Sequence, residues 1–296
     1  MIKNLFDNEN AIYMGAKRSP DDCDDCAIGI FGVNYDGTCS FKPGARFGPE
    51  AIRQVSSCLE TYCPNLNKDL EDILYVDFGS ILIDNNDSKS VIESVKSATN
   101  FLINKRLSPI MLGGEHSITT GAIEALVKKY PDLILVQLDA HADLRESYIG
   151  NKHSHACTMK RCLEVLPEKK ILQVGIRSGT KEEFQFMHNN NQLINFRPGE
   201  NAQKLKQALL PYSKSPIYLT IDLDWFDPSL LAGTGTPEPG GFFWSDFEEI
   251  LKTLRDFRIV ASDIVELSPE IDKSGVSSIV AAKVLRSLIL SLENMQ

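Results

Sequence analysis

Four apolar segments of the chain run directly into clusters of residues that can do chemistry. Along the sequence these clusters are Gly113–Ser117 (GGEHS), Asp139–Asp143 (DAHAD), Asp222–Pro228 (DLDWFDP) and Glu266–Pro269 (ELSP). In extended backbone, residues two apart project to the same side, so Asp139, His141 and Asp143 can face one point, as can Asp222 and Asp224. Ligands of open α/β sheets bind beyond the carboxyl ends of the strands. The pattern therefore predicts that imidazoles and carboxylates gather at one edge of a sheet.

Carboxylates gathered in this way need a counter-charge. Four ionised aspartates close together repel one another and raise each other's pKa values, whereas two divalent cations cancel their charge. Nitrogen and oxygen ligands without thiolate suit manganese or a related metal better than a structural zinc ion. For a single residue such as Asp143 or Asp222, the alternative is an aspartate that caps a loop at a strand end. Together, six residues favour a metal pair: His116, Asp139, His141, Asp143, Asp222 and Asp224.

The elements that must position these residues alternate along the chain. Apolar runs rich in β-branched residues predict strands at Ala27–Val33, Ile73–Phe78, Ser108–Leu112, Leu133–Leu138, Ile171–Ile176, Gln192–Phe196, Ile217–Leu223 and Ile259–Val265. Amphipathic stretches predict helices at Pro49–Cys58, Ser88–Asn104, Ile118–Lys129, Ala202–Leu210, Ser245–Phe257 and Val276–Leu292. Strands that are apolar on both faces and separated by helices indicate a mostly parallel, doubly wound α/β sheet. No linker or repeat interrupts the pattern, so we expect residues 1–296 to form a single domain.

Several motifs, in the same order along the chain, resemble the ureohydrolases, the family that includes arginase and agmatinase. Gly113–Ser117 is similar to the first signature of that family, Asp139–Asp143 to its DAHxD signature and Asp222–Pro228 to its DxDxxDP signature. Lys42–Pro49 (KPGARFGP) resembles its N-terminal RPGARFGP motif, with lysine in place of the first arginine. Gly233–Gly241 (GTGTPEPGG) resembles its GTGTPExGG loop. The resemblance runs through most of the chain.

The resemblance implies a three-layer α/β/α sandwich of the arginase/deacetylase type, with two manganese ions per chain. One ion would be held by His116, Asp139, Asp143 and Asp222. The other would be held by Asp139, His141, Asp222 and Asp224, with Asp139 and Asp222 bridging. The implied reaction is hydrolysis of a guanidinium group to urea and an amine by a metal-bridging hydroxide. Family members form trimers or hexamers, so a homo-oligomer is expected.

Three residues acquire catalytic roles by the same resemblance. Asp143 would pass a proton to the leaving amine. Glu266 would pair with the guanidinium, where two parallel hydrogen bonds fix its orientation. His155 would relay protons between the site and solvent. His153, two residues away in the same polar loop, is the alternative, but the segment Ser154–Cys157 matches the agmatinase pattern more closely.

The segment after the DAHxD signature bears on the substrate. Leu144–Ala156 nearly reproduces the agmatinase pattern LRxxYxGxxxSHA and lacks the Ser/Asn-rich pattern with which arginases hold an α-carboxylate and an α-amine. Agmatine, which ends in a bare ammonium, is therefore the favoured substrate, with urea and putrescine as products. Guanidinobutyrate and arginine are alternatives, since Arg145 could serve a carboxylate. A non-catalytic regulatory relative is a further alternative, although such a protein is expected to lose some of the six ligands.

Two positions depart from the family pattern. Leu231-Ala232 stands where the loop usually reads Ala-Pro, and the missing proline removes a fixed φ from the pocket rim. Glu115 stands where many relatives carry aspartate. Glu115 is next to His116, a predicted ligand. Neither departure replaces a predicted ligand.

The composition argues against other classes of protein. With 40 acidic and 31 basic residues the formal charge is -9, which repels phosphate backbones and favours cationic small molecules, so we expect no nucleic-acid partner. No apolar run approaches the roughly 18 residues that span a bilayer, and the N-terminus lacks a signal-peptide pattern. We therefore expect a cytoplasmic protein without a membrane partner. Seven scattered cysteines, including a CxxC formed by Cys23 and Cys26, suit free thiols in a reducing compartment.

Overall fold

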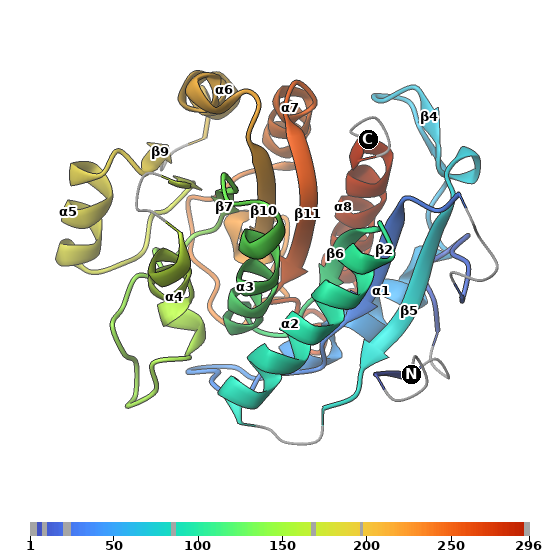
Figure 1. Cartoon of the computed structure of the whole chain (residues 1–296), viewed down its shortest axis with the longest axis horizontal. Coiled ribbons are helices and arrows are strands. Elements are labelled where there is room, and N and C mark those ends of the chain that lie inside the picture. Colours follow the sequence, from blue (N-terminus) through green and yellow to red (C-terminus); the bar gives the residue numbers. More distant parts are fainter. Residues whose placement is uncertain are drawn as a thin grey trace.

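The computed structural model describes residues 5–7, 11–19, 25–83, 87–166, 170–195 and 198–292. A nine-stranded sheet forms its centre, in the order β1-β5-β2-β6-β11-β10-β7-β8-β9 (Figure 1). These strands are β1 (Phe6–Asp7), β2 (Ile28–Gly32), β5 (Tyr75–Ile81), β6 (Ser108–Leu112), β7 (Ile134–Leu138), β8 (Ile171–Val174), β9 (Leu193–Asn195), β10 (Pro216–Asp222) and β11 (Arg258–Val265). Strand β1 is antiparallel to β5, and the other neighbours in the sheet are parallel. A separate antiparallel pair joins β3 (Tyr62–Cys63) and β4 (Lys68–Asp69).

The predicted fold class is confirmed, with nine strands rather than about eight. All eight expected strands occur at similar bounds, although Phe196, the last residue of one prediction, lies outside the described residues. The additional strand is β1, in which Phe6 and Asp7 pair with Ile81 and Ser80 at the edge of the sheet. A strand of two residues is too short to show a period in the sequence, which is why the pattern did not predict it.

Helices cover both faces of the sheet (Figure 1). Four helices bury their apolar residues on one face: α2 (Ser88–Asn104), α3 (Thr119–Lys129), α4 (Thr158–Val165) and α5 (Lys181–Asn189). The other four pack on the opposite face: α1 (Gly48–Ser56), α6 (Asn201–Leu209), α7 (Trp244–Leu254) and α8 (Val276–Leu292). The sequence patterns predicted six of these helices and missed α4 and α5.

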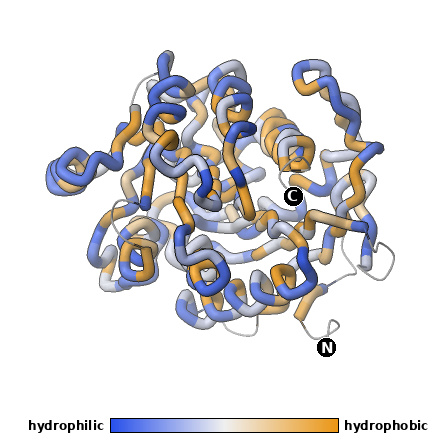
Figure 2. The backbone as a smooth tube through the Cα atoms, turned by 45° about the horizontal axis from the view of Figure 1, so that its top comes forward, coloured by the Kyte–Doolittle hydropathy of each residue, from blue (hydrophilic) through white to orange (hydrophobic). Residues whose placement is uncertain are grey.

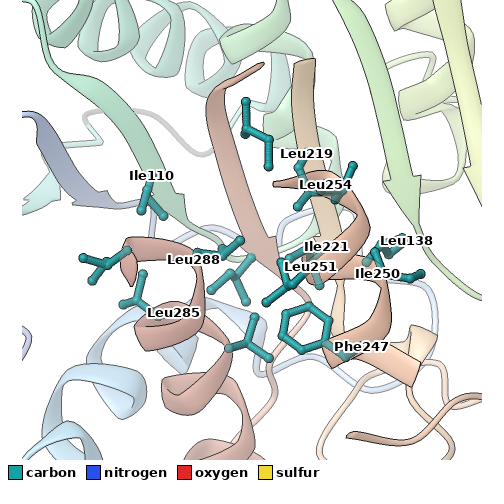
Figure 3. Close-up of a cluster of buried hydrophobic side chains, with 14 of the residues drawn as sticks. Ile110, Leu138, Leu219, Ile221, Phe247, Ile250, Leu251, Leu254, Leu285 and Leu288 are labelled. Atoms are coloured by element: carbon teal, nitrogen blue, oxygen red, sulfur yellow. The ribbon is translucent and has the colours of Figure 1, made fainter. Parts of the chain in front are cut away.

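Side chains of each strand alternate between the two apolar layers. In β7, Ile134 and Val136 belong to one buried cluster and Leu135 to the other. Leu219 of β10 packs in the first cluster with Phe247 of α7 (Figure 3). Coloured by hydropathy, the chain shows its apolar stretches along the strands and on the inner sides of the helices (Figure 2). Since each fully buried large apolar side chain stabilises the fold by about 1.5–3 kcal/mol, this core holds the sheet rigidly in place.

A buried ion pair ties α1 to β5. Arg53 donates from Nε to Oδ2 of Asp77 (2.9 Å) and from Nη2 to Oδ1 (2.8 Å), and both side chains are fully buried. Arg53 also donates to Ser80 Oγ and to the carbonyl of Gly79. The paired geometry and these further bonds satisfy a charge that would otherwise be costly to bury.

No helix within the described ranges is both long and apolar enough to cross a membrane. Five cysteines in these ranges are free, as expected: Cys39, Cys58, Cys63, Cys157 and Cys162. Cys26 is disulfide-bonded, so the expectation of free thiols is wrong at this position. Cys23, the other cysteine of the CxxC, lies outside the described residues.

Candidate metal centre

The candidate site forms at the carboxyl ends of four neighbouring strands, β6, β11, β10 and β7. Asp222 is the last residue of β10 and pairs with Val265 of β11. One residue earlier, Ile221 pairs with Leu138, the last residue of β7. Asp139 and Asp222 therefore leave the sheet side by side and at the same level.

The GGEHS segment reaches this edge through a close backbone contact. A Cβ atom on Gly114 would lie 1.7 Å from the carbonyl oxygen of Tyr35, so no larger residue fits here. Gly114 donates its N–H to Val33 O (2.8 Å), and Glu115 donates its N–H to Tyr35 O (2.8 Å). These contacts hold the start of the short helix on which His116 lies.

Backbone N–H groups orient three of the aspartates. Asp139 Oδ1 accepts from the N–H of His141 (2.6 Å). Asp222 Oδ1 accepts from the N–H of Asp224 (2.9 Å). Asp224 Oδ1 accepts from the N–H of Ala140 (3.2 Å). The Oδ2 atom of Asp224 then lies 2.9 Å from His141 Nδ1. Each carboxylate thus uses one oxygen for the backbone and turns the other towards the cluster.

His116 presents an unpartnered nitrogen to the same cluster. It is only 1% exposed, and its Nε2 lies 2.8 Å from Thr220 Oγ1. Its Nδ1 has no hydrogen-bond partner in the described part of the chain. That atom lies 3.1 Å from Asp139 Oδ2, 3.1 Å from Asp143 Oδ2 and 3.3 Å from Asp222 Oδ2. A buried nitrogen facing three carboxylate oxygens is well placed to bind a cation.

The structure brings together all six residues that the sequence predicted as metal ligands. Ligand atoms of His116, Asp139 and Asp222 lie within 4.8 Å of one another, and so do those of Asp139, His141 and Asp224. Asp139 belongs to both groups, as a bridging ligand would. The sixth residue, Asp143, is the one that approaches Nδ1 of His116. The nitrogen and oxygen donors fit divalent cations of the manganese type.

The buried carboxylates of the cluster repel one another and have shifted pKa values. Burial, together with the charges of Asp143 and Asp224, raises the pKa of Asp139 to about 7. Burial, with the charges of Asp224 and Asp139, raises the pKa of Asp222 well above its ordinary value. Burial lowers the pKa of His141, but the carboxylate of Asp224 outweighs it and raises that pKa to about 11. Divalent cations would supply the positive charge that protons otherwise bring to this cluster.

A cavity of about 230 Å³ adjoins the cluster. Its lining includes the two sequence-predicted residues Asp143 and His155, together with Arg145, Tyr148 and Glu183. His153, the alternative to His155, is not among the lining residues; its N–H donates to Asn151 Oδ1 instead. Of these two histidines, His155 is therefore the one that lies at this cavity.

Glu266 is a buried carboxylate next to the candidate ligand His116. Its Oε1 accepts from the N–H of His116 (2.7 Å), and its side chain lines a smaller cavity together with His155 and Thr236. Burial and the charge of Glu115 raise the pKa of Glu266 well above its ordinary value. Glu266 and Asp143 both have positive φ, +67° and +54°. Such backbone is strained in residues other than glycine and is concentrated at functional sites.

Several supporting residues were missed by sequence reasoning. Gln137 donates to Asp139 Oδ2 (2.6 Å). A polar residue inside the apolar strand β7 was the signal that could have revealed it. Arg177 donates to the carbonyls of Asp224 and Glu238, 2.7 Å each, and so ties the GTGTPEPGG loop to the site. Nothing in the Arg177 segment marked it in advance.

The loop that departs from the family pattern is anchored at Leu231. This side chain is 1% exposed, and its N–H donates to Asp227 O (3.0 Å). Asp227 in turn accepts from the N–H groups of Gly240 and Gly241, which closes the loop on itself.

Comparison with known proteins agrees with this geometry. The family model described as "Arginase family" matches residues 26–291. The chain is 36% identical to the agmatinase of Halalkalibacterium halodurans over 263 residues, which cover 88% of this chain and 90% of that one. It is 38% identical to the N(1)-aminopropylagmatine ureohydrolase of Thermococcus kodakarensis over 264 residues, 86% and 87% of the two chains. The structure of the agmatine ureohydrolase of Thermoplasma volcanium matches with a TM-score of 0.81 and 33% identity, covering 95% of this chain and 96% of that one. The resemblance seen in the motifs is confirmed: the chain belongs to the arginase family and is a ureohydrolase of the agmatinase type.

Proposed function

We propose that this ureohydrolase uses two manganese ions to hydrolyse the guanidinium of agmatine to urea and putrescine. The observation that carries the proposal is the pair of ligand groups that share Asp139 beside a substrate-sized cavity. The arginase family is a family of binuclear metal enzymes. The first ion would be held by His116, Asp139, Asp143 and Asp222, and the second by Asp139, His141, Asp222 and Asp224.

The roles of the protein groups follow from their positions. When bound, a metal pair activates water as a nucleophile near neutral pH. Glu266, which is buried next to His116, would orient the guanidinium by paired hydrogen bonds. Asp143 belongs to the proposed ligand cluster and also lines the cavity, so its carboxylate would pass a proton to the leaving amine. His155 lines the same cavity nearer to solvent and would exchange that proton with bulk water.

Outside the candidate ligands, the cavity lining includes one acidic and one basic side chain, Glu183 and Arg145. Glu183 lines it with a carboxylate that accepts from the N–H groups of Leu144 (3.0 Å) and Thr180 (2.7 Å). This fixed negative charge favours the ammonium of agmatine. Arg145 lines it with a guanidinium whose Cζ lies 4.9 Å from the centre of the Tyr148 ring. No carboxylate in the described ranges pairs with Arg145, and this favours guanidinobutyrate as the second candidate substrate.

A urea-release assay separates the candidates. With manganese added, we expect agmatine to exceed arginine in kcat/KM by about 10²-fold or more, because arginine would bury a carboxylate and an amine without dedicated partners. Chelation should abolish turnover of every substrate. Arg145→Met should leave agmatine turnover nearly unchanged. A wild type that hydrolyses guanidinobutyrate more efficiently than agmatine, and loses that turnover in Arg145→Met, would identify guanidinobutyrate as the substrate. Arginine hydrolysed as efficiently as agmatine would refute the assignment of agmatine.

We also propose a single domain spanning residues 1–296 and a homo-oligomer, either a trimer or a hexamer. Light scattering coupled to size-exclusion chromatography measures the mass directly against the 33.0 kDa of one chain. A monomer at all concentrations would contradict this part of the proposal.

A further inference from the structure

Thr38 connects a buried carboxylate to His155. Its hydroxyl Oγ1 lies 2.5 Å from Glu115 Oε1, and its backbone N–H donates to Glu115 Oε2 (2.7 Å). Ser117 donates a further hydrogen bond to Glu115 Oε1 (2.5 Å). On its other side, Thr38 Oγ1 accepts from the N–H of His155 (3.1 Å) and lies 3.3 Å from His155 Nδ1.

The hydrogen-bond count at Thr38 fixes the direction of each bond. A hydroxyl has one hydrogen to donate and two lone pairs to accept with. The buried Glu115 accepts from the N–H of Thr38 and the hydroxyl of Ser117. The Thr38 hydroxyl donates its one hydrogen to the same carboxylate. Thr38 Oγ1 can then meet His155 Nδ1 only by accepting a hydrogen from that nitrogen.

The opposite edge of the imidazole faces the cavity. His155 Nε2 lies 3.4 Å from Oγ of Ser40, an exposed residue of the cavity lining. The ring of Tyr148 packs edge-on against the imidazole, with centroids 5.9 Å apart and planes at 83°. Ser154 Oγ also approaches Nδ1, at 3.4 Å, but Thr38 is nearer and its orientation is set by the carboxylate.

The loop that carries Thr38 is itself clamped. Asp36 Oδ2 accepts from the N–H of Gly44 (2.8 Å), and its Oδ1 accepts from Arg46 Nε (2.5 Å). Gly44 has a φ of +140°, which a residue with a side chain rarely adopts. The KPGARFGP motif thus closes residues 36–46 into a loop that presents Thr38 to His155.

We propose that Thr38, clamped by Glu115, is a positioning residue that holds neutral His155 with its proton on Nδ1 and leaves the lone pair of Nε2 towards the cavity. In this state Nε2 can accept a proton at the site and release it to water, while Nδ1–H stays bonded to Thr38. The role of His155 as a proton relay rests on the proposed function, whereas the tautomer of its ring does not. Glu115 would act through Thr38, because its carboxylate accepts from both the hydroxyl and the backbone N–H of Thr38.

Solid-state ¹⁵N NMR of the sedimented full chain tests the tautomer without any substrate. Histidine is labelled with ¹⁵N, magnesium is added as a diamagnetic divalent ion, and the signal of His155 among the five histidines is identified by its loss in His155→Gln. We expect the Nδ1–H tautomer in the wild type and in Thr38→Ser, and its loss in Thr38→Val, which has the same shape but no hydroxyl. An Nε2–H tautomer in the wild type, or no change in Thr38→Val, would overturn the proposal.

Kinetics test whether the tautomer matters for turnover. On whichever guanidino compound the wild type hydrolyses, Thr38→Val should lower kcat about ten-fold with KM nearly unchanged, and Thr38→Ser should restore kcat. Manganese content should match the wild type. In a His155→Ala background, Thr38→Val should cause no further loss, whereas a merely structural role predicts an additive loss. Failure to hydrolyse agmatine would refute the proposed substrate and leave the NMR result standing.

Discussion

The hydrogen bond between His116 and Thr220 should set the affinity of one metal site. With a metal ion on Nδ1 of His116, which faces the carboxylates, the proton of the neutral ring would lie on Nε2 and donate to Thr220 Oγ1, 2.8 Å away. Thr220→Val removes this acceptor with almost no change of shape. Because His116 is 1% exposed, water does not replace the hydroxyl, and an unpaired buried donor costs roughly 1–3 kcal/mol. At about 1.4 kcal/mol per factor of ten, we expect manganese affinity at this site to fall about 10–100-fold, the usual range for outer partners of metal-bound histidine.

Equilibrium dialysis against a chelator of known affinity, with metal analysis, measures the effect without any assay of activity. Thr220→Ser should bind nearly as well as the wild type because it keeps the hydroxyl. Thr119→Val is the matched control: the fully buried Thr119 donates its hydroxyl to Asp263 Oδ2 (2.7 Å), and its one described bond to His116 is from the backbone N–H, which valine keeps. Unchanged affinity in Thr220→Val, or an equal loss in Thr119→Val, would refute the reasoning.

Three further predictions concern the bridge, the proton relay and the core. Asp139→Ala should lose most of both manganese equivalents, measured by metal analysis of reconstituted protein, because this residue belongs to both ligand groups. His155→Ala should keep its metals and slow kcat by about 10²–10⁴-fold, and the same loss in His153→Ala instead would reverse that assignment. Arg53→Met leaves a buried carboxylate unpaired and should lower the free energy of unfolding by about 3–5 kcal/mol in denaturant titrations, whereas Lys206→Ala, which breaks an exposed pair, should cost less than about 1 kcal/mol.

The clustering of the six candidate ligands could be predicted because they lie at the ends of strands, where the periodicity of the sequence is informative. Asp139 and Asp222 directly follow or end buried strands, and parallel strands bring their carboxyl ends to one edge. The alternation of residues in DAHAD then predicts which side chains share a direction. Strand ends and residue alternation are local properties of the sequence. The parallel sheet then brings these strand ends together, so the contacts between distant residues follow from the fold class.

Other features depend on contacts that leave no local pattern. Thr38 and His155 are separated by 117 positions, and their bond depends on how a loop closes. Helix α5 was missed because only Glu183 and Met187 of its nine residues are buried, so its apolar period is weak. A capping box between Thr180 and Glu183 marked its start and was the signal that could have revealed it. Glu183 serves the cap and lines the cavity as well.

Backbone strain and buried like charges at the site lower the stability of the fold, and bound cations should offset this loss. Asp143 and Glu266 have positive φ, which costs about 1–3 kcal/mol each, and burial and like charges raise the pKa values of Asp139 and Asp222. Ions that bind only the folded chain stabilise it by mass action, about 2.7 kcal/mol per site at a free concentration 100-fold above Kd. Chelation should therefore lower Tm, and manganese should restore it in scanning calorimetry. Asp139→Ala, which lacks the residue shared by both ligand groups, should show little dependence of Tm on chelator. A wild-type Tm that does not change on removal of metal would show that these carboxylates are stabilised by the protein alone.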